Sequence, residues 1–266
     1  MRLTLRSLYR KLPKWVRTAI ISIRRNVSAK YFTHFSQLLR FLRNLAEFRR
    51  SGGRVTNFYP ILDDFKDGAG TASGHYFHQD LFVASLIAAN NPRRHIDVGS
   101  RIDGFVAHVA SFRKIEILDV RSLGEIGHPQ ITFIQRDLMV AEPGSGEITD
   151  SLSCLHTIEH FGLGRYGDRI DPHGHLKGFQ NLVDMLEPGG LLYISFPIGN
   201  RDSVYFNAHR VFHPTSILKW PLRDGPLELK QFSFVDDSGD FHRNVPLDAS
   251  LPELLYGCGI YTFCKS

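Results

Sequence analysis

Short apolar runs alternate with amphipathic stretches through most of the chain. A helical pattern of apolar positions begins at Tyr76 and stops at Asn90-Asn-Pro92, because proline cannot continue a helix. A second helical pattern, at 176–186, ends at Glu187-Pro-Gly-Gly190. This alternation predicts an α/β fold, a doubly wound and mostly parallel sheet with helices on both faces. The apolar runs that predict its strands are residues 95–99, 115–120, 131–134, 151–155 and 191–196, with a further helix at 104–111.

Two short alternating runs near the C-terminus complete the sheet in this interpretation. Leu227–Phe232 and Gly259–Phe263 suit strands with one buried face. We expect them to be antiparallel strands at the edge of the sheet. The polar stretch 233–245 between them is expected to be a loop. Cys258 and Cys264 are expected to be packed thiols rather than nucleophiles or metal ligands.

The first 53 residues predict a helical arm ahead of this sheet. Apolar residues recur every three or four positions over 5–27 and again over 35–48, which is the spacing of one helical face. Pro13 is expected to kink the first of these two amphipathic helices. We therefore expect three segments: a basic helical arm at 1–53, a linker or cover at 54–74 and a globular domain at 75–266.

Charge is divided unequally between the arm and the body. The net charge is +5, but residues 1–50 hold 13 Lys and Arg against a single acid, Glu47, whereas the remaining 216 residues hold 19 Lys and Arg against 26 acids. The total charge alone would favour a nucleic-acid partner. Such a partner is not expected, because only the arm could supply contacts to phosphates.

The arm leaves four interpretations open. A basic amphipathic helix suits an anionic membrane surface, and its apolar face could instead pack on the protein's own body or on a second copy in a homodimer. A nucleic-acid contact and an Arg-rich organellar targeting peptide are the other two. No run reaches the roughly 18 apolar residues of a membrane span, and no signal-peptide core precedes a cleavage site. We expect a cytoplasmic protein, peripheral on the inner face of the membrane.

Acidic residues stand at the ends of the first three predicted strands. Asp97-Val-Gly99 ends the first strand, Asp119 closes the second strand 22 residues after Asp97, and Asp137 follows the third. A glycine turn lets the backbone approach a ligand, and a carboxylate about 20 residues further on can accept both hydroxyls of a ribose. A carboxylate at the third strand could meet the exocyclic amine of a base. Since ligands of such sheets sit at the carboxyl ends of the strands, these residues predict a site for an adenosine-like ligand.

Together these motifs resemble those of class I S-adenosylmethionine-dependent methyltransferases. The helix–Leu-x-Pro-Gly-Gly–strand arrangement at 186–197 is the most specific of them, and the strand ending in Glu-His at 150–160 is frequent in that superfamily. Residues 162–168 and 206–210 further resemble a narrower methyltransferase-like family, catalogued as a domain of unknown function and associated with surface-polysaccharide genes. The first glycine motif departs from the usual pattern, because Arg101 and Asp103 stand where further glycines are expected.

The resemblance covers about residues 74–214 and implies S-adenosylmethionine as the cofactor. It also implies which residues contact each part of that cofactor. They are Asp97 and Gly99 beside the methionine moiety, Asp119 on the ribose hydroxyls, Asp137 and Leu138 at the adenine, and Leu155 and His156 near the transferable methyl group.

Six of the 13 histidines lie between residues 156 and 213. His156-Thr-Ile-Glu159-His160 matches the H-x-x-E-H pattern of one class of zinc metalloprotease. The pattern follows an apolar strand directly, and Phe161-Gly-Leu-Gly164 interrupts any long helix. The methyltransferase resemblance also accounts for the flanking segments, which the protease pattern does not. Neither a protease nor a bound metal is therefore expected.

Methyl transfer to a hydroxyl needs a base that takes the proton of the attacking group. An imidazole titrates near neutral pH and suits that role. His160 and His209 are the preferred bases, with Glu159 orienting a histidine or accepting the proton. Side chains with sugar-type hydrogen-bonding groups are expected to bind the acceptor, although each could instead rigidify its loop: Arg165, Tyr166, Asp168, Asn207 and Arg210.

The sequence thus favours a transferase that methylates a hydroxyl of a sugar or glycan in surface-polysaccharide biosynthesis. A lipid-linked acceptor would give the basic arm a purpose. The altered glycine turn supports an alternative, in which a methyltransferase fold has lost its cofactor and serves as a binding or scaffold protein at the membrane surface. An RNA methyltransferase would use the arm. The acidic body and the lack of an Asn/Asp-Pro-Pro-aromatic segment after the fourth strand argue against it.

Overall fold

The computed structural model describes residues 36–62, 64–141, 146–223, 225, 227–248 and 251–266. By its internal contacts the chain divides into two compact units, Met1–Thr71 and Ala72–Ser266. Across the described ranges of both units, every helix is too short or too polar to cross a bilayer.

The described part of the first unit contains an α-helix over residues 36–50, where the sequence predicts the second helix of the arm. The amide of Gly53 donates to the carbonyl oxygen of Phe48 at 2.9 Å and closes the end of this helix. Four of its apolar side chains, Leu38, Leu39, Leu42 and Phe48, are between 42% and 54% exposed. The first predicted helix of the arm, at 5–27, lies outside the described residues.

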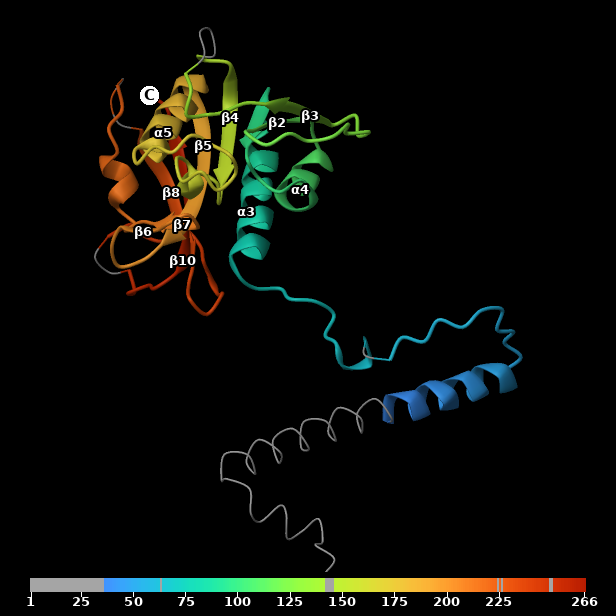
Figure 1. The fold of residues 1–266 in the computed structure, drawn as a ribbon. Helices are drawn as coiled ribbons and strands as arrows, with labels where there is room; N and C mark the ends of the chain where they lie inside the picture. Colours follow the sequence, from blue (N-terminus) through green and yellow to red (C-terminus); the bar gives the residue numbers. More distant parts are fainter. Residues whose placement is uncertain (1–35, 63, 142–145, 224, 226, 249–250) are drawn as a thin grey trace, which may run out of the picture. The chain divides into compact units, whose positions relative to one another are not determined.

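In the described part of the second unit, an eight-stranded sheet forms the centre (Figure 1). Its strand order is β3-β2-β1-β4-β5-β10-β8-β9, and β1 to β5 are parallel. β10 runs antiparallel to both β5 and β8, and β9 runs antiparallel to β8. The strands are β1 (His95–Val98), β2 (Ile115–Asp119), β3 (Ile131–Gln135), β4 (Thr149–Leu155), β5 (Leu186–Ile198), β8 (Glu228–Val235), β9 (Phe241–His242) and β10 (Gly257–Cys264).

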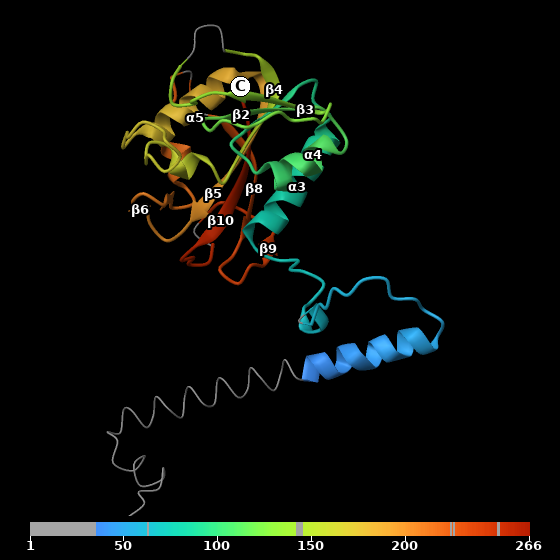
Figure 2. The same cartoon turned by 45° about the vertical axis from the view of Figure 1, so that its right-hand side comes forward.

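Helices cover both faces of this sheet. α3 (His75–Asn90) and α4 (Ala107–Ala110) lie on one face and α5 (Gly174–Met185) on the other (Figures 1 and 2). The hydrophobic core therefore has two layers, one that includes Ile87 of α3 and one that includes Leu182 of α5, both fully buried. The predicted α/β fold, a mostly parallel sheet with antiparallel C-terminal strands, is confirmed.

The C-terminal strands differ from the prediction in two places. β10 lies inside the sheet, between β5 and β8, and not at its edge. The segment 233–245, predicted to be a loop, contains the end of β8 and all of β9. Ser233 is fully buried, and its hydroxyl accepts a hydrogen bond from the backbone amide of Asn244 at 2.9 Å. Polar residues are therefore satisfied within the sheet here, which hides the strand from a hydropathy pattern.

The helix predicted after the first strand is shorter and less regular than expected. Gly104 has non-helical backbone angles (φ −117°, ψ −112°), so that a π-helical turn precedes α4. The connections that follow β2 and β3 contain no helix in their described residues. The smaller elements are η1 (Asp64–Lys66), η2 (Ile102–Val106), η3 (Ile158–His160), η4 (Ser216–Lys219) and the two-stranded sheet of β6 (Ser203–Tyr205) and β7 (His209–Val211).

The strand order reverses between β1 and β4. β1 is followed in the sheet by β2 on one side and by β4 on the other, so the loops that leave their carboxyl ends diverge and open a crevice. Gly99, Asp119, Asp137 and His156 all follow or end strands of this parallel set. The fold thus brings residues from four chain segments to one edge of the sheet.

Candidate functional site

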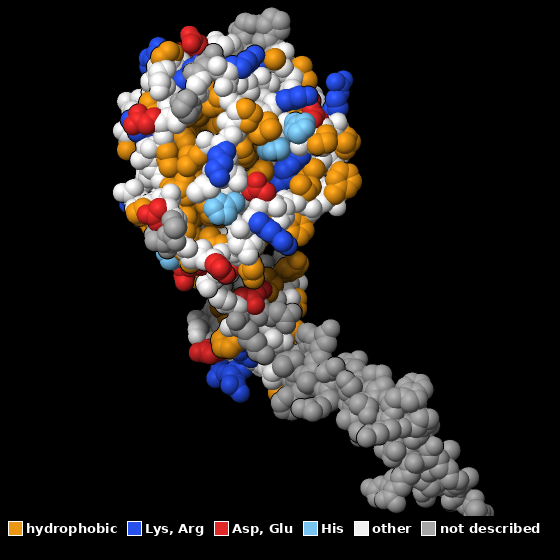
Figure 3. Space-filling model, turned by 90° about the vertical axis from the view of Figure 1, so that its left-hand side faces the viewer, with side chains coloured by type: hydrophobic (Ala, Val, Ile, Leu, Met, Phe, Trp, Pro, Cys, Tyr) orange, Lys and Arg blue, Asp and Glu red, His pale blue; other side chains and the backbone are white. Residues whose placement is uncertain are grey.

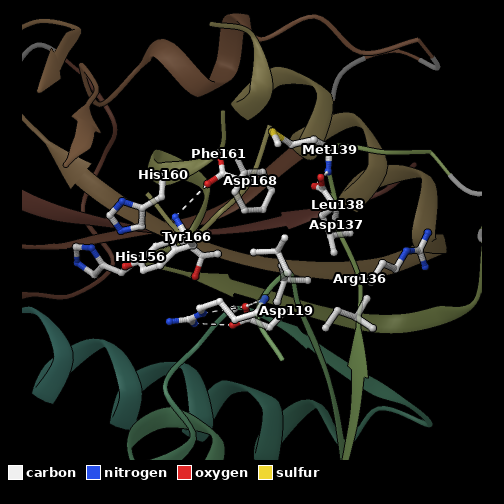
Figure 4. Close-up of a pocket in the computed structure, with 16 residues that line it drawn as sticks. Asp119, Arg136, Asp137, Leu138, Met139, His156, His160, Phe161, Tyr166 and Asp168 are labelled. Carbon is white, nitrogen blue, oxygen red and sulfur yellow. Dashed lines mark hydrogen bonds and ion pairs between the residues drawn. The ribbon is translucent and has the colours of Figure 1, made fainter. Parts of the chain in front are cut away.

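Two adjoining hollows lie at this edge of the sheet. The strand-end pocket is formed by the residues that follow β1 to β4 (Figure 4). The histidine pocket is formed by the start of α3, the loop after β1 and the segments around His160 and His209. The two pockets share five lining residues: Gly99, Arg121, His156, His160 and Tyr166.

Asp97 lies beneath the pockets and lines neither of them. Its carboxylate is fully buried and accepts hydrogen bonds from the backbone amide and hydroxyl of Ser100, at 3.1 and 2.8 Å, and from the hydroxyl of Ser153 at 2.5 Å. Burial raises the pKa of Asp97 to about 6, against the effect of these donors. Asp97 therefore holds the turn after β1 in place.

Gly99 occupies a backbone conformation that requires glycine. Its φ is +72°, and a Cβ at this position would lie 2.4 Å from Cγ2 of Thr157. Gly99 lines both pockets, so the bare backbone of this turn faces the space that a ligand would occupy.

We expect Gly99→Ala to lower the free energy of unfolding by about 2–3 kcal/mol, because it adds a steric clash to left-handed backbone strain. Gly189→Ala is the matched control, since Gly189 has a φ of +79° but nothing within 4 Å of its added Cβ. Urea denaturation of both variants measures the difference. Equal losses of unfolding free energy in the two variants would show that the contact with Thr157 does not affect stability.

Asp119 ends β2 and points its carboxylate into the strand-end pocket (Figure 4). Arg121 binds both of its oxygens, with Nε 2.9 Å from Oδ1, Nη2 2.5 Å from Oδ2 and its own backbone amide 2.8 Å from Oδ1. The hydrogen bond to Asp119 raises the pKa of Arg121. Asp119 thus forms a charged pair that a ligand hydroxyl would have to open.

Asp137 and Leu138 form another wall of the strand-end pocket (Figure 4). One oxygen of Asp137 accepts a hydrogen bond from the backbone amide of Met139 at 2.9 Å, and the carbonyl of Leu138 accepts one from Nδ2 of Asn181 at 2.7 Å. Asn181 belongs to α5, so the helix fixes the loop that follows β3. This wall offers a carboxylate beside an apolar surface.

Glu159 connects two histidines at the end of β4. Its side chain is 1% exposed, and Oε1 lies 3.0 Å from Nδ1 of His156 and 3.7 Å from Nε2 of His160. His160 donates from Nδ1 to the carbonyl oxygen of Ala208, at 2.8 Å. This assigns the proton to Nδ1 and leaves Nε2 of His160 able to accept one. Leu155, 2% exposed, precedes these residues and lines the histidine pocket.

Burial affects both histidines that the sequence predicts as bases. It lowers the pKa of His160 despite the opposing attraction of Glu159, and it lowers the pKa of His209 in the same way. Both side chains line the histidine pocket. Each is therefore neutral, and able to act as a base, at neutral pH.

Three of the five residues predicted to bind an acceptor line these pockets: Arg165, Tyr166 and Asp168. Asp168 also accepts hydrogen bonds from the backbone amides of Gly162, Gly164 and Tyr166 and so shapes its own loop. Arg210 and Asn207 line neither pocket.

Arg210 is 3% exposed, and its guanidinium donates to the backbone carbonyls of Glu159, Phe161 and Pro172. It fastens the segment that carries Glu159 and His160, and its burial places it away from any substrate. Asn207 is exposed outside both pockets. The sequence predicts that Arg210 contacts a substrate. In the structure its guanidinium binds backbone carbonyls instead.

The structure adds lining residues that sequence reasoning missed. Tyr76 and Gln79, near the start of α3, and Tyr256, before β10, line the histidine pocket. They approach it through packing of distant segments, so the sequence holds no local signal for them. Arg121 could have been found, because it follows the strand-end acid Asp119 by two residues.

Charges of both signs are mixed around this region. Arg101, Arg121 and Arg165 line the histidine pocket together with the acids Asp80 and Glu159. Figure 3 shows one face of the molecule, on which basic, acidic, histidine and hydrophobic side chains are interspersed. The described residues of that face do not form the continuous basic surface that binds nucleic-acid phosphates.

Comparisons with known proteins agree with this architecture. The profile of a family described as "Caenorhabditis protein of unknown function, DUF268" matches residues 145–218. A search of curated proteins finds no match.

Among solved structures, the 1,6-didemethyltoxoflavin-N1-methyltransferase of Burkholderia thailandensis, with bound 1,6-didemethyltoxoflavin and S-adenosylhomocysteine, matches with a TM-score of 0.50 and 12% identity, covering 88% of this chain and 90% of that chain. The N-methyltransferase NodS of Bradyrhizobium japonicum matches with a TM-score of 0.47 and 12% identity, covering 78% and 93%. A methyltransferase of Clostridium acetobutylicum matches with a TM-score of 0.48 and 13% identity, covering 73% and 94%. The Burkholderia match shows a shared Rossmann-like methyltransferase fold.

Proposed function

We propose that this chain is an S-adenosylmethionine-dependent methyltransferase that acts on a hydroxyl of a sugar or glycan. The observation that carries the proposal is the strand-end pocket, which Asp119 and Asp137 line together and which continues to His156 and His160 (Figure 4). Polar groups that could bind a ribose, bind a base and accept a proton from the acceptor thus lie next to one another in this pocket, at the switch point of the sheet. The shared methyltransferase fold supports the same conclusion.

The residues of the strand-end pocket fit the cofactor. Asp119 would bind the ribose hydroxyls, and Asp137 with Leu138 would hold the adenine, since one offers an acceptor and the other an apolar contact. The turn at Gly99, where no Cβ fits, would let the backbone approach the methionine moiety. When bound, the cofactor supplies an electrophilic methyl group on a sulfonium sulfur.

His160 is the base we assign to this reaction. Its Nδ1 is committed to the carbonyl of Ala208, so Nε2 would take the proton of the acceptor hydroxyl as that oxygen attacks. Glu159, 3.7 Å from Nε2, would stabilise the imidazolium that forms. Because Glu159 is 1% exposed, it positions and stabilises histidines rather than contacting the acceptor.

An anionic sugar derivative suits the histidine pocket. Arg101, Arg121 and Arg165 line it beside Tyr76 and Tyr256, and arginine binds phosphate or carboxylate oxygens in a bidentate manner. Aromatic rings offer flat apolar surfaces to a sugar ring. We therefore propose a phosphorylated or lipid-linked sugar of surface-polysaccharide biosynthesis as the acceptor.

The rate of transfer should persist at pH values where an ordinary histidine is already protonated. Burial lowers the pKa of His160 below its usual 6.5, although Glu159 opposes this. A lowered pKa keeps the base neutral further into the acid range, so the acid limb of kcat/KM, which reports the free enzyme, should be centred below 6.5. Glu159→Gln should move that limb to still lower pH, because the opposing attraction is lost. A limb centred above 6.5 in the wild type would contradict the assignment of His160 as base.

Binding and transfer are tested in sequence. Isothermal titration calorimetry with S-adenosylmethionine and S-adenosylhomocysteine measures the first step. Transfer of a tritiated methyl group to a panel of free sugars, nucleotide sugars and lipid-linked glycans measures the second. Absence of binding heat at millimolar cofactor would overturn the proposal, and a labelled product from the panel would identify the acceptor class.

We also propose that the arm attaches the protein to anionic membranes. Residues 1–50 hold 13 Lys and Arg against one acid, and the helix at 36–50 has exposed leucines. Such a segment gains both apolar burial and attraction to anionic lipids. Co-sedimentation with phosphatidylglycerol vesicles, but not with phosphatidylcholine vesicles, is the expected result. Dimerisation without vesicle binding would favour a protein partner for the arm.

Two observations favour a second candidate, a scaffold protein without catalysis. Arg121 occupies both oxygens of Asp119, and Arg101 and Asp103 pair with each other where the motif usually has glycines. A protein of this kind would bind vesicles without binding S-adenosylmethionine. The same calorimetry and sedimentation experiments therefore separate the two candidates.

A further inference from the structure

Three potential metal ligands from distant parts of the chain meet behind the histidine pocket. His75 is the first residue of α3, His156 follows β4 and Cys258 lies on β10. One donor atom from each side chain lies within 4.8 Å of the other two. The fold thus assembles a group of two imidazoles and one thiol from residues up to 183 positions apart in the chain.

One imidazole nitrogen of this group is available. Nδ1 of His156 is bonded to Oε1 of Glu159 at 3.0 Å. Nε2 of the same ring is buried and has no hydrogen-bond partner among the described residues, and the side chain is 5% exposed. Leaving a buried polar atom unpaired costs free energy. A ligand at Nε2 would remove that cost.

Both histidines are oriented by groups outside the cluster. Glu159 holds His156 through Nδ1, and the ring of His75 stacks on that of Tyr256 at a centroid distance of 5.6 Å. A histidine that binds a metal commonly has its second nitrogen fixed by a carboxylate, as Nδ1 of His156 is. The rings of His75 and His156 stack at a centroid distance of 5.3 Å and an interplanar angle of 11°, so one ring has to turn for both imidazoles to bind the same ion in their ring planes.

The charges around the cluster favour a cation. Oε2 of Glu159 is buried without a hydrogen-bond partner among the described residues, and a buried carboxylate is costly unless a positive charge balances it.

A nucleophilic role for Cys258 does not fit the same geometry. The residue has no exposed surface and lines neither pocket. Its Sγ lies 3.7 Å from Oε1 of Gln79, which shields it further. A substrate could not reach this sulfur.

We propose that His75, His156 and Cys258 bind a thiolate-preferring divalent cation of the zinc class. Zinc–nitrogen bonds of about 2.0–2.1 Å and zinc–sulfur bonds of about 2.3 Å place tetrahedral donors roughly 3.3–3.6 Å apart. Since the donor atoms now lie within 4.8 Å of one another, the side chains must approach by up to about 1.5 Å to bind the ion. Binding forms a zinc–sulfur bond and releases the thiol proton of Cys258 to solvent, without any redox change. Three protein ligands leave a fourth position for water or another oxygen ligand.

The full-length chain, freed of metal with a chelator and dialysed against Zn²⁺, should retain about one zinc per chain by elemental analysis, as expected for a single site. Cys258→Ser and His75→Ala should abolish this retention. Glu159→Gln should weaken zinc binding by about 10- to 100-fold, since it removes only the group that orients His156. The matched controls, expected to retain the zinc, are Cys264→Ser, on the same strand, and His128→Ala, in an exposed loop.

Cobalt substitution of the wild type provides a measurement that does not depend on the folding of variants. Co²⁺ bound to Cys258 should give a thiolate-to-cobalt charge-transfer band and the visible spectrum of a tetrahedral site. The proposal is overturned if the wild type retains no zinc, if the cobalt protein lacks the thiolate band, or if a folded Cys258→Ser retains the full zinc content. Cofactor calorimetry is a separate measurement, so failure of the metal site and failure of the methyltransferase proposal are distinguishable.

Discussion

Replacement of Asp119 by alanine is expected to weaken the binding of S-adenosylhomocysteine by about 10- to 100-fold. A hydrogen bond to a charged group contributes about 1.5–3 kcal/mol, and about 1.4 kcal/mol changes an affinity tenfold. Two ribose hydroxyls could contribute more, but Asp119 already accepts hydrogen bonds from the guanidinium of Arg121. Exchanging one set of donors for another returns only part of that energy. Isothermal titration calorimetry measures the change directly.

Two further variants separate this contact from general effects on folding. Glu228→Gln removes an acid of β8 whose side chain is 60% exposed, and it should leave the affinity unchanged. Arg121→Ala removes the guanidinium that competes for Asp119, and it should bind the ligand at least as tightly as the wild type. An Asp119→Ala variant with wild-type affinity would exclude Asp119 from the ribose site.

Replacement of His160 by alanine is expected to reduce kcat for methyl transfer by about 10²- to 10⁴-fold, which is the usual contribution of a positioned general base. The affinity for S-adenosylhomocysteine should stay close to that of the wild type, because the ribose and adenine contacts belong to other residues. The rate is measured as transfer of a tritiated methyl group to the acceptor that the panel identifies.

His209→Ala is the comparison that identifies the base. His209 lines the histidine pocket but not the strand-end pocket, whereas His160 lines both. We expect the larger loss of kcat for His160→Ala, and a larger loss for His209→Ala would transfer the role to His209. Thermal unfolding must accompany both variants, since His160 also contacts the ring of Tyr166 edge-on, at a centroid distance of 5.4 Å.

The parallel half of the fold could be predicted because its strands are short apolar runs with clear ends. From Leu192 onward β5 is buried and mostly apolar, so its character is visible without knowledge of its neighbours. In β4 only Leu152, Cys154 and Leu155 supply that signal, between buried serines. The C-terminal end of β8 could not be predicted from the sequence. Ser233 is fully buried, and its polarity is compensated by a contact with Asn244, which no local pattern reveals.

The residues of the site show the same contrast between positions that follow from strand ends and positions that depend on packing. Asp119 and Asp137 could be predicted to line one pocket because their positions follow directly from the ends of β2 and β3. In the sequence Arg210 has the chemistry of a substrate-binding residue. In the structure it is buried and therefore has an internal role. The grouping of His75 with Cys258 depends entirely on how α3 packs near β10, which lies beyond sequence spacing.

The wall shared by the two pockets has a thermodynamic consequence. Arg121 lines both of them and is paired with Asp119. A ribose that takes Asp119 would release the guanidinium toward the histidine pocket, where an anionic acceptor could bind it. The two ligands would then bind cooperatively, and by linkage each must strengthen the other by the same factor. Arg121→Ala should abolish that reciprocity, so a single side chain would couple the affinities of the two substrates.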